Sequence, residues 1–135
     1  MMETIKVKIK KTDLFRLKRD GFTKKPFVFE AAEGKGKYVI THGIKCGKHT
    51  FLKIGKSLAF STKGLTKYLI KEGMINVNDS INLICCYGAG VKNNTDVVNV
   101  VTNTTKKVVW HWIDNVLDSI FPTMFSADYL TITEK

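Results

Sequence analysis

The sequence has few cysteines and no long hydrophobic run, and both shortages narrow the kinds of protein it can encode. Three cysteines among 135 residues, two of them adjacent, do not make the even set of a disulfide framework, so a disulfide-stapled secreted domain is excluded. No stretch approaches the roughly 18 apolar residues of a membrane helix. The lysine-rich residues 1–25 contain no apolar segment of signal-peptide length. We therefore expect a soluble cytoplasmic protein with no membrane partner.

The chain also lacks internal repeats, linkers and low-complexity stretches. Hydrophobic residues make up 44% of it and aromatic residues 10%, which is the composition of a globular protein rather than a disordered one. A chain of 135 residues can bury a core without disulfides or metal ions. Residues 1–135 are therefore predicted to form a single domain.

Acidic residues are scarce relative to basic ones in the first half of the chain. Residues 1–72 hold 18 of the 22 Lys and Arg residues but 6 of the 12 acidic ones, so this half carries +12 and the remainder −2. Such asymmetry favours an anionic partner, nucleic acid or another polyanion, bound through residues 1–72. The same charge asymmetry is also typical of a basic face that is simply solvated. No lysine run is interleaved with aromatic residues as in a known RNA or DNA module.

Two strand-like runs flank a helical segment in the middle of the chain. Residues 37–42 are β-branched and aromatic and lie between glycines, and residues 80–86 form a mostly apolar run after a turn-like segment. Between them, residues 61–71 carry apolar side chains at helical spacing, with Ser61 as the expected N-cap. A strand, helix, strand unit is right-handed and its strands are parallel. The two runs are therefore predicted to belong to one parallel sheet.

The remaining segments are predicted from shorter patterns. The other expected strands are residues 5–9, 27–32, 51–58, 107–112 and 129–133. The other expected helices are residues 13–19, 96–106 and 115–121, of which the first is a short helix or a turn. The fold class that follows is α/β, with a small mixed, largely parallel sheet flanked by helices.

His42 ends the first of the two central runs, and Cys86 ends the second. In open parallel sheets the functional crevice lies beyond the carboxyl ends of the strands, so both side chains are expected at one crevice. A cysteine thiolate is a nucleophile, and a neighbouring histidine favours that form. Cys85, one residue earlier, is expected on the opposite face of the strand and in the core.

His42-Gly43 after a hydrophobic strand, then a helix, then a second strand that ends at Cys86 with a small-residue loop, resembles the caspase-like cysteine peptidases. That group includes clostripain-like enzymes, gingipains and the self-cleaving domains of bacterial toxins, and the resemblance covers residues 37–112. It implies a caspase-like core and a peptidase that cleaves a protein substrate or itself. It further implies Cys86 as the nucleophile, His42 as the general acid and the backbone N–H groups of Gly43 and Cys86 as the oxyanion hole, with no cofactor.

Other interpretations of these residues stay open. Cys86 is also compatible with the role of a small buried hydrophobe. His42, Cys46 and His49 have the spacing H-x3-C-x2-H, and with Cys85 or Cys86 as a fourth ligand they predict a zinc site as an alternative. For the whole chain, the alternatives are a catalytically inactive binding module of the same fold and a basic protein that binds nucleic acid or another polyanion.

Overall fold

A four-stranded sheet lies at the centre of the computed structural model, which describes residues 4–30, 36–103, 110–112 and 127–133. Its strands, in spatial order, are β2 (Phe27–Glu30), β3 (Lys37–Ile40), β7 (Ser80–Ile84) and β8 (Asn99–Thr102). β2 is antiparallel to β3, whereas β3, β7 and β8 run parallel to one another. The prediction of an α/β fold with a mixed sheet is confirmed.

The helix α2 (Thr62–Lys71) lies between β3 and β7 in the sequence. Leu65 and Leu69, four residues apart, are both fully buried in the core beneath this helix. Ser61 precedes the helix at the N-cap position in an extended conformation, but its side chain makes no capping hydrogen bond, and the Lys63 N–H donates to the Asn94 side chain instead. Gly73 follows it at φ +71° and donates its N–H to the carbonyl of Ile70, a left-handed ending that glycine adopts without a Cβ clash. The predicted helix over residues 61–71 and the parallel strands around it are confirmed.

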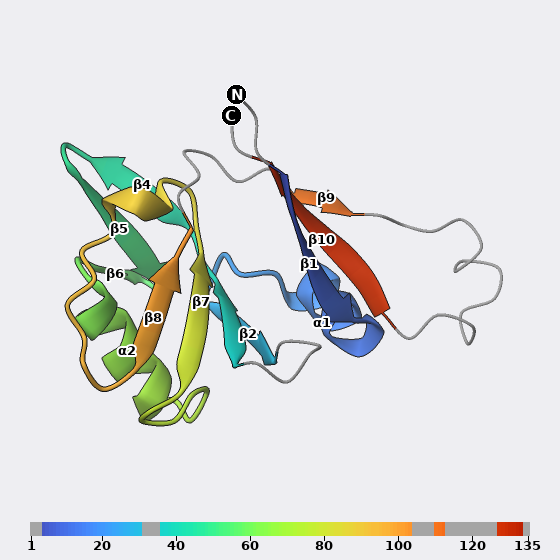
Figure 1. Ribbon diagram of the computed structural model, residues 1–135, viewed down its shortest axis with the longest axis horizontal. Helices are drawn as coiled ribbons and strands as arrows, with labels where there is room; N and C mark the ends of the chain where they lie inside the picture. Colours follow the sequence, from blue (N-terminus) through green and yellow to red (C-terminus); the bar gives the residue numbers. More distant parts are fainter. Residues whose placement is uncertain (1–3, 31–35, 104–109, 113–126, 134–135) are drawn as a thin grey trace, which may run out of the picture.

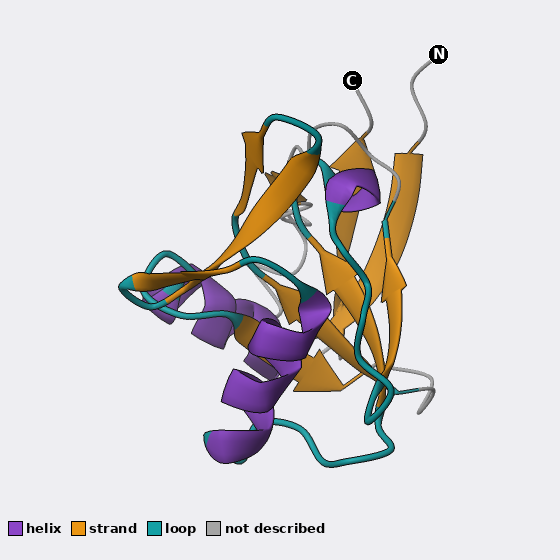
Figure 2. Ribbon diagram, turned by 90° about the vertical axis from the view of Figure 1, so that its left-hand side faces the viewer, coloured by secondary structure: helices purple, strands orange, loops and turns teal. Residues whose placement is uncertain are grey.

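Different elements cover the two faces of the central sheet. The core on the α2 side contains Val39, Ile81, Leu83 and Cys85 together with Leu65 and Leu69. The core on the other side contains Leu17 of α1 (Lys11–Asp20) with Phe27, Phe29, Ile40 and Ile84. Figure 1 shows the sheet between the two helices, and Figure 2 turns α2 to the front. A core therefore packs against each face of β3 and β7, whereas Val101 of the edge strand β8 stays 55% exposed.

A small antiparallel sheet stands between β3 and α2 in the chain. It consists of β4 (Gly43–Cys46), β5 (His49–Ile54) and β6 (Ser57–Ala59), in that order. Two tight turns join the strands, and each contains a glycine at positive φ, Gly47 and Gly55. The predicted strand character of residues 51–58 holds for both β5 and β6. β4 follows His42 directly, so the chain leaves the central sheet at that histidine.

A third sheet joins the two ends of the described chain. β1 (Thr4–Lys10) pairs antiparallel with β10 (Ala127–Thr133), which pairs with β9 (Trp110–Trp112). In Figure 1 this sheet stands on the α1 side of the molecule. The strands predicted over residues 5–9 and 129–133 are confirmed, and the helix predicted over residues 13–19 corresponds to α1. The strand predicted over residues 107–112 is confirmed for its last three residues.

The helix predicted over residues 96–106 is wrong, because its middle forms the strand β8. The valines alternate between the two faces of a strand: Val98 and Val100 are buried, whereas Val97 and Val101 are 42% and 55% exposed. This period of two, together with pairing to the parallel edge of β7, outweighs the helical spacing that the same valines satisfy. The helix predicted over residues 115–121 lies outside the described residues.

The caspase-like arrangement of helices is not confirmed. In the described part of the chain there are two α-helices, one against each face of the central sheet, and none between β7 and β8. No helix among the described residues is long and apolar enough to span a membrane.

Candidate functional site

The parallel pairing of β3 with β7 brings His42 and Cys86 to matching positions. Ile40 is the register partner of Ile84, and the N–H of Thr41 donates to the carbonyl of Ile84 at 3.2 Å, so the ladder continues past the last paired residues. His42 and Cys86 each stand two positions beyond Ile40 and Ile84, the last pair of that register. Neighbouring strands of a sheet lie about 4.8 Å apart, so the two backbones emerge side by side at the carboxyl edge.

Both side chains lie toward the α1 face of the sheet. Cys86 packs against the cluster that contains Ile40 and Ile84. The ring of Phe22 packs against the same cluster, and its centroid lies 4.6 Å from that of His42. His42 and Cys86 are both half-buried. A cysteine and a histidine thus share one face, one sheet edge and partial access to solvent.

Gly43 allows the two segments to approach each other closely. A Cβ atom at this position would overlap the backbone carbonyl of Cys86 and press against the methyl group of Thr50. Lys53 donates its N–H to the carbonyl of His42 at 3.0 Å, which makes these two residues a hydrogen-bonded pair of the antiparallel ladder. In that ladder the next residue, Gly43, directs its N–H away from β5. The N–H group expected to serve an oxyanion hole is therefore not used by the β4–β5 pairing.

The chain around Cys86 is held by side chains from two other elements. Asn103, just beyond β8, accepts a hydrogen bond from the Cys85 N–H at 3.1 Å and donates one to the Cys85 carbonyl at 2.9 Å. The hydroxyl of Thr50 in β5 donates to the carbonyl of Tyr87 at 2.7 Å, and Tyr87 itself is in the left-handed region at φ 57°. Asn103 and Thr50 therefore fix the backbone on both sides of Cys86 and act as positioning residues.

Sequence reasoning missed Phe22, Thr50 and Asn103. Asn103 is far from Cys85 in the sequence, and it reaches that residue because β8 pairs with β7. An asparagine directly after a β-branched run is the signal that could have drawn attention to it, once that run is assigned to a strand. Phe22 lies in a loop with no pattern that links it to His42.

Burial changes the pKa of both His42 and Cys85. Burial, with a smaller contribution from the positive charge of Lys53, lowers the pKa of His42 below its ordinary value of 6.5. Its imidazole is therefore neutral at neutral pH and available as a base. Burial raises the pKa of Cys85 to about 12, so that thiol stays protonated. Cys85 is fully buried on the α2 side, which confirms its predicted place in the core.

The zinc alternative is not supported by the geometry. Cys46 and His49 face each other across the end of the β4–β5 hairpin. His42 lies at the opposite end of β4, four residues from Cys46, a separation on the order of 13 Å along a strand. Among the described residues, no group of three or more His, Cys, Asp or Glu side chains lies close enough to hold a metal ion.

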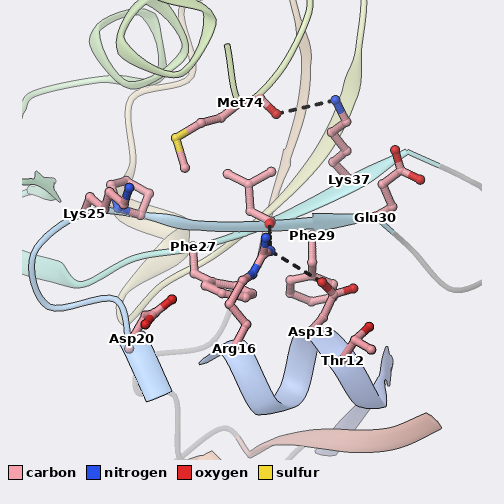
Figure 3. A pocket seen from close by; sticks show the side chains of 13 residues that line it. Thr12, Asp13, Arg16, Asp20, Lys25, Phe27, Phe29, Glu30, Lys37 and Met74 are labelled. Carbon is pink, nitrogen blue, oxygen red and sulfur yellow. Dashed lines mark hydrogen bonds and ion pairs between the residues drawn. The ribbon is translucent and has the colours of Figure 1, made fainter. Parts of the chain in front are cut away.

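A cavity of about 570 Å³ opens along β2, the edge strand of the central sheet. Figure 3 shows Arg16 reaching from α1 between the rings of Phe27 and Phe29 toward β2. Its guanidinium donates to the carbonyl of Val28 at 2.9 Å and lies 3.4 Å from the carboxylate of Asp13. Neither His42 nor Cys86 lines this cavity. Gly21 does line it, and the next residue in the chain, Phe22, contacts His42.

Comparisons with protein-family models, with curated proteins and with solved structures found no match to this chain.

Proposed function

We propose that the protein is a cysteine peptidase in which Cys86 and His42 form a catalytic dyad. The observation that supports the proposal is the parallel pairing of β3 with β7, whose register, continued two residues past Ile40 and Ile84, puts His42 opposite Cys86 toward one face of the sheet. The proposal includes a caspase-like arrangement of the core over residues 37–112. It also includes a cytoplasmic setting, in which reducing conditions keep the thiol available.

The chemistry follows from the groups present. The neutral imidazole of His42 takes the proton of the Cys86 thiol, and the sulfur forms a bond to the carbonyl carbon of the scissile peptide. The C–N bond then breaks, and the imidazolium of His42 gives that proton to the leaving amine. Water next attacks the thioester, which releases the carboxylic acid and restores the thiol. The N–H groups of Gly43 and Cys86 are proposed to bind the oxyanion, in line with the direction of the Gly43 N–H away from β5.

The proposed substrate is a peptide segment of a protein, or of the chain itself. The cavity beside β2 supports this class of substrate, because it runs along an edge strand, where an extended peptide that displaced Arg16 from the Val28 carbonyl could pair. Its lining combines apolar rings with charged groups of both signs, including Lys25 and Glu30 at opposite ends of β2. An anionic partner for residues 1–72 is a separate proposal, considered below.

The test is selective alkylation of Cys86 as a function of pH. Wild type, His42→Ala and His49→Ala are treated with iodoacetamide, and modified cysteines are counted by intact mass and located by peptide mapping. We expect Cys86 to react faster than the exposed Cys46 at neutral pH. That advantage is lost in His42→Ala and kept in His49→Ala, which removes an exposed histidine from the far end of the same hairpin.

Cleavage is then measured on a peptide library with Cys86→Ala and Cys46→Ala. Activity that disappears in the first variant and persists in the second supports the dyad. The proposal fails if Cys86 reacts at the rate of Cys46, if it is inert, or if its reactivity does not depend on His42. Cys85 is fully buried, so its lack of modification in each variant shows that alkylation took place on folded protein.

A further inference from the structure

The outward face of the small β4–β5–β6 sheet carries a cluster of exposed apolar and aromatic side chains. In β5, Thr50 and Leu52 are buried, so His49, Phe51 and Lys53 lie on the opposite, outward face. The ladder pairs Phe51 with Ile44 of β4 and Lys53 with Leu58 of β6, which places these residues on the same face. Phe60 follows β6. We call this set, His49, Phe51, Lys53, Ile44, Leu58 and Phe60, the β5 platform.

The aromatic members of the β5 platform contact one another and remain open to solvent. The ring of Phe60 lies 5.2 Å from that of His49 and 5.5 Å from that of Phe51, measured between centroids. Phe60 is 43% exposed, Ile44 45% and Leu58 53%. Three large apolar side chains that are this exposed on one small sheet indicate a surface that a partner covers.

Lysine side chains border the β5 platform. The Lys92 ammonium lies 5.4 Å from the centroid of Phe60, and a backbone bridge between Ser61 and Lys92 holds the two segments together. Lys53 is on this face and Lys48 and Lys56 are in the two turns, whereas Lys45 pairs with the buried Thr50 and lies over Tyr87 on the other face. Residues 43–59 contain no Asp or Glu. The nearest acidic residues in the sequence on either side are Glu33 and Glu72. The partner that complements this charge is an anion.

We propose that the β5 platform binds single-stranded nucleic acid. Its rings offer faces on which unpaired bases stack, and its lysines lie where they can contact the phosphates between those bases. Duplex DNA buries its base faces in the stack, and an acidic peptide has no comparable aromatic planes, so neither matches both properties of the surface. The platform comes from one continuous stretch, residues 44–60, in which lysines and aromatic residues are interleaved, and the pairing of its three strands puts the members on one face. This surface does not depend on the proposed peptidase activity.

The test is the binding of a fluorescein-labelled oligo(dT) or oligo(U) strand of about 12 nucleotides, followed by fluorescence anisotropy at several salt concentrations. We expect Phe60→Ala and Phe51→Ala each to weaken binding roughly tenfold, the loss of one stacked base. Lys53→Gln is expected to weaken binding and to reduce the slope of log affinity against log salt by about one contact.

Matched controls come from the rest of the molecule. Phe15 in α1 is 67% exposed and lies on an element that packs against the other face of the central sheet, so Phe15→Ala should bind like wild type. Lys71→Gln, at the end of α2, also removes one positive charge, but at a site outside the platform. Its affinity for the labelled oligonucleotide should stay within about twofold of that of wild type. Circular dichroism and thermal unfolding establish that each variant is folded.

Competitors identify the partner class. A duplex of equal length, heparin and anionic phospholipid vesicles are each tested against the labelled strand. The proposal is overturned if heparin or duplex binds as tightly as the single strand and Phe60→Ala has no effect, because that pattern is charge attraction alone. It is also overturned if vesicles bind in preference to the strand, or if no probe binds the wild type at low salt.

Discussion

At the scale of single residues, His42 combines two features that act on its protonation. Its ring is half-buried against Phe22, and the ammonium of Lys53 adds a positive charge nearby. Both disfavour the imidazolium, so the folded protein resists protonation of this histidine more than the unfolded chain does. A neutral imidazole is also what the proposed proton transfer from Cys86 requires.

This difference predicts how stability depends on pH. Because the pKa of His42 is lower in the folded state than its value of 6.5 in an unstructured chain, the unfolded state binds more protons below that pH. The contribution of neutral His42 to stability is complete above 6.5 and is lost as the pH falls through the folded-state pKa. We expect the free energy of unfolding in urea to fall less in His42→Gln than in wild type between about pH 7.5 and 5.

His49→Gln, which changes an exposed histidine of β5, is measured alongside as a control for the substitution itself. Parallel pH profiles for wild type and His42→Gln would show that the folded environment does not disfavour the charged ring, and the argument for a neutral base would fail with it.

At the scale of elements, the local pattern of the sequence predicts the β3–α2–β7 unit well. The apolar spacing in residues 61–71, the N-cap Ser61 and the glycine after the helix all act within one segment. β8 could not be predicted in the same way, because its valines fit both a helical face and an alternating strand. The parallel edge of β7 decides between them, and that edge exists only in the folded chain.

The candidate site likewise combines residues that a local sequence pattern indicates with residues that only tertiary packing brings in. His42 and Cys86 were found because each ends a strand-like run, and parallel pairing then brings them together. Phe22, Thr50 and Asn103 come from a loop, the small sheet and the end of β8, and each reaches the site through tertiary packing. The aromatic members of the β5 platform lie within residues 49–60, and the pairing of β5 with β6 is what brings Phe60 against His49 and Phe51. Strand ends can be read locally, but contacts between elements cannot.

The contact between β4 and the segment after β7 gives the next prediction. Gly43→Ala places a methyl group against the Cys86 carbonyl, a backbone group that cannot swing away, so the two elements must separate. We expect a loss of about 1–3 kcal/mol in the free energy of unfolding, as for overpacked sites, and a slower alkylation of Cys86. Urea denaturation and intact mass measure the two effects.

Gly64→Ala is the matched control for that substitution. Gly64 lies in α2, and its added methyl group would meet the side chain of Ala59 at 3.4 Å, an ordinary contact. The change should stabilise the protein by about 0.5 kcal/mol through the helical preference of alanine. If Gly43→Ala is as harmless as Gly64→Ala, the close approach of His42-Gly43 to Cys86 is not a feature of the folded protein.

At the scale of the whole molecule, charge is the dominant property. The net charge is +10, and the basic residues are concentrated in the first half of the sequence. Between residues 34 and 71 there is no acidic residue, although this segment builds the small sheet, α2 and the strand that carries His42 to the sheet edge. Few of these lysines have an acidic residue nearby in the sequence. Among the described residues of this segment, Lys37 forms an ion pair, with Asp79 at 3.1 Å.

Repulsion among these lysines predicts that salt stabilises the fold. Raising NaCl from about 20 to 300 mM shortens the Debye length and screens the lysines from one another, so we expect the melting temperature to rise by about 2–4 °C. Lys56→Glu, in the exposed turn between β5 and β6, should raise the melting temperature at low salt and shrink the response to NaCl, because it introduces the missing negative charge within the basic segment. Thermal unfolding followed by circular dichroism measures both effects. A melting temperature that stays constant or falls with salt would mean that the basic segment is already neutralised within the folded chain, and a surface with no charge left to offer would not attract nucleic acid.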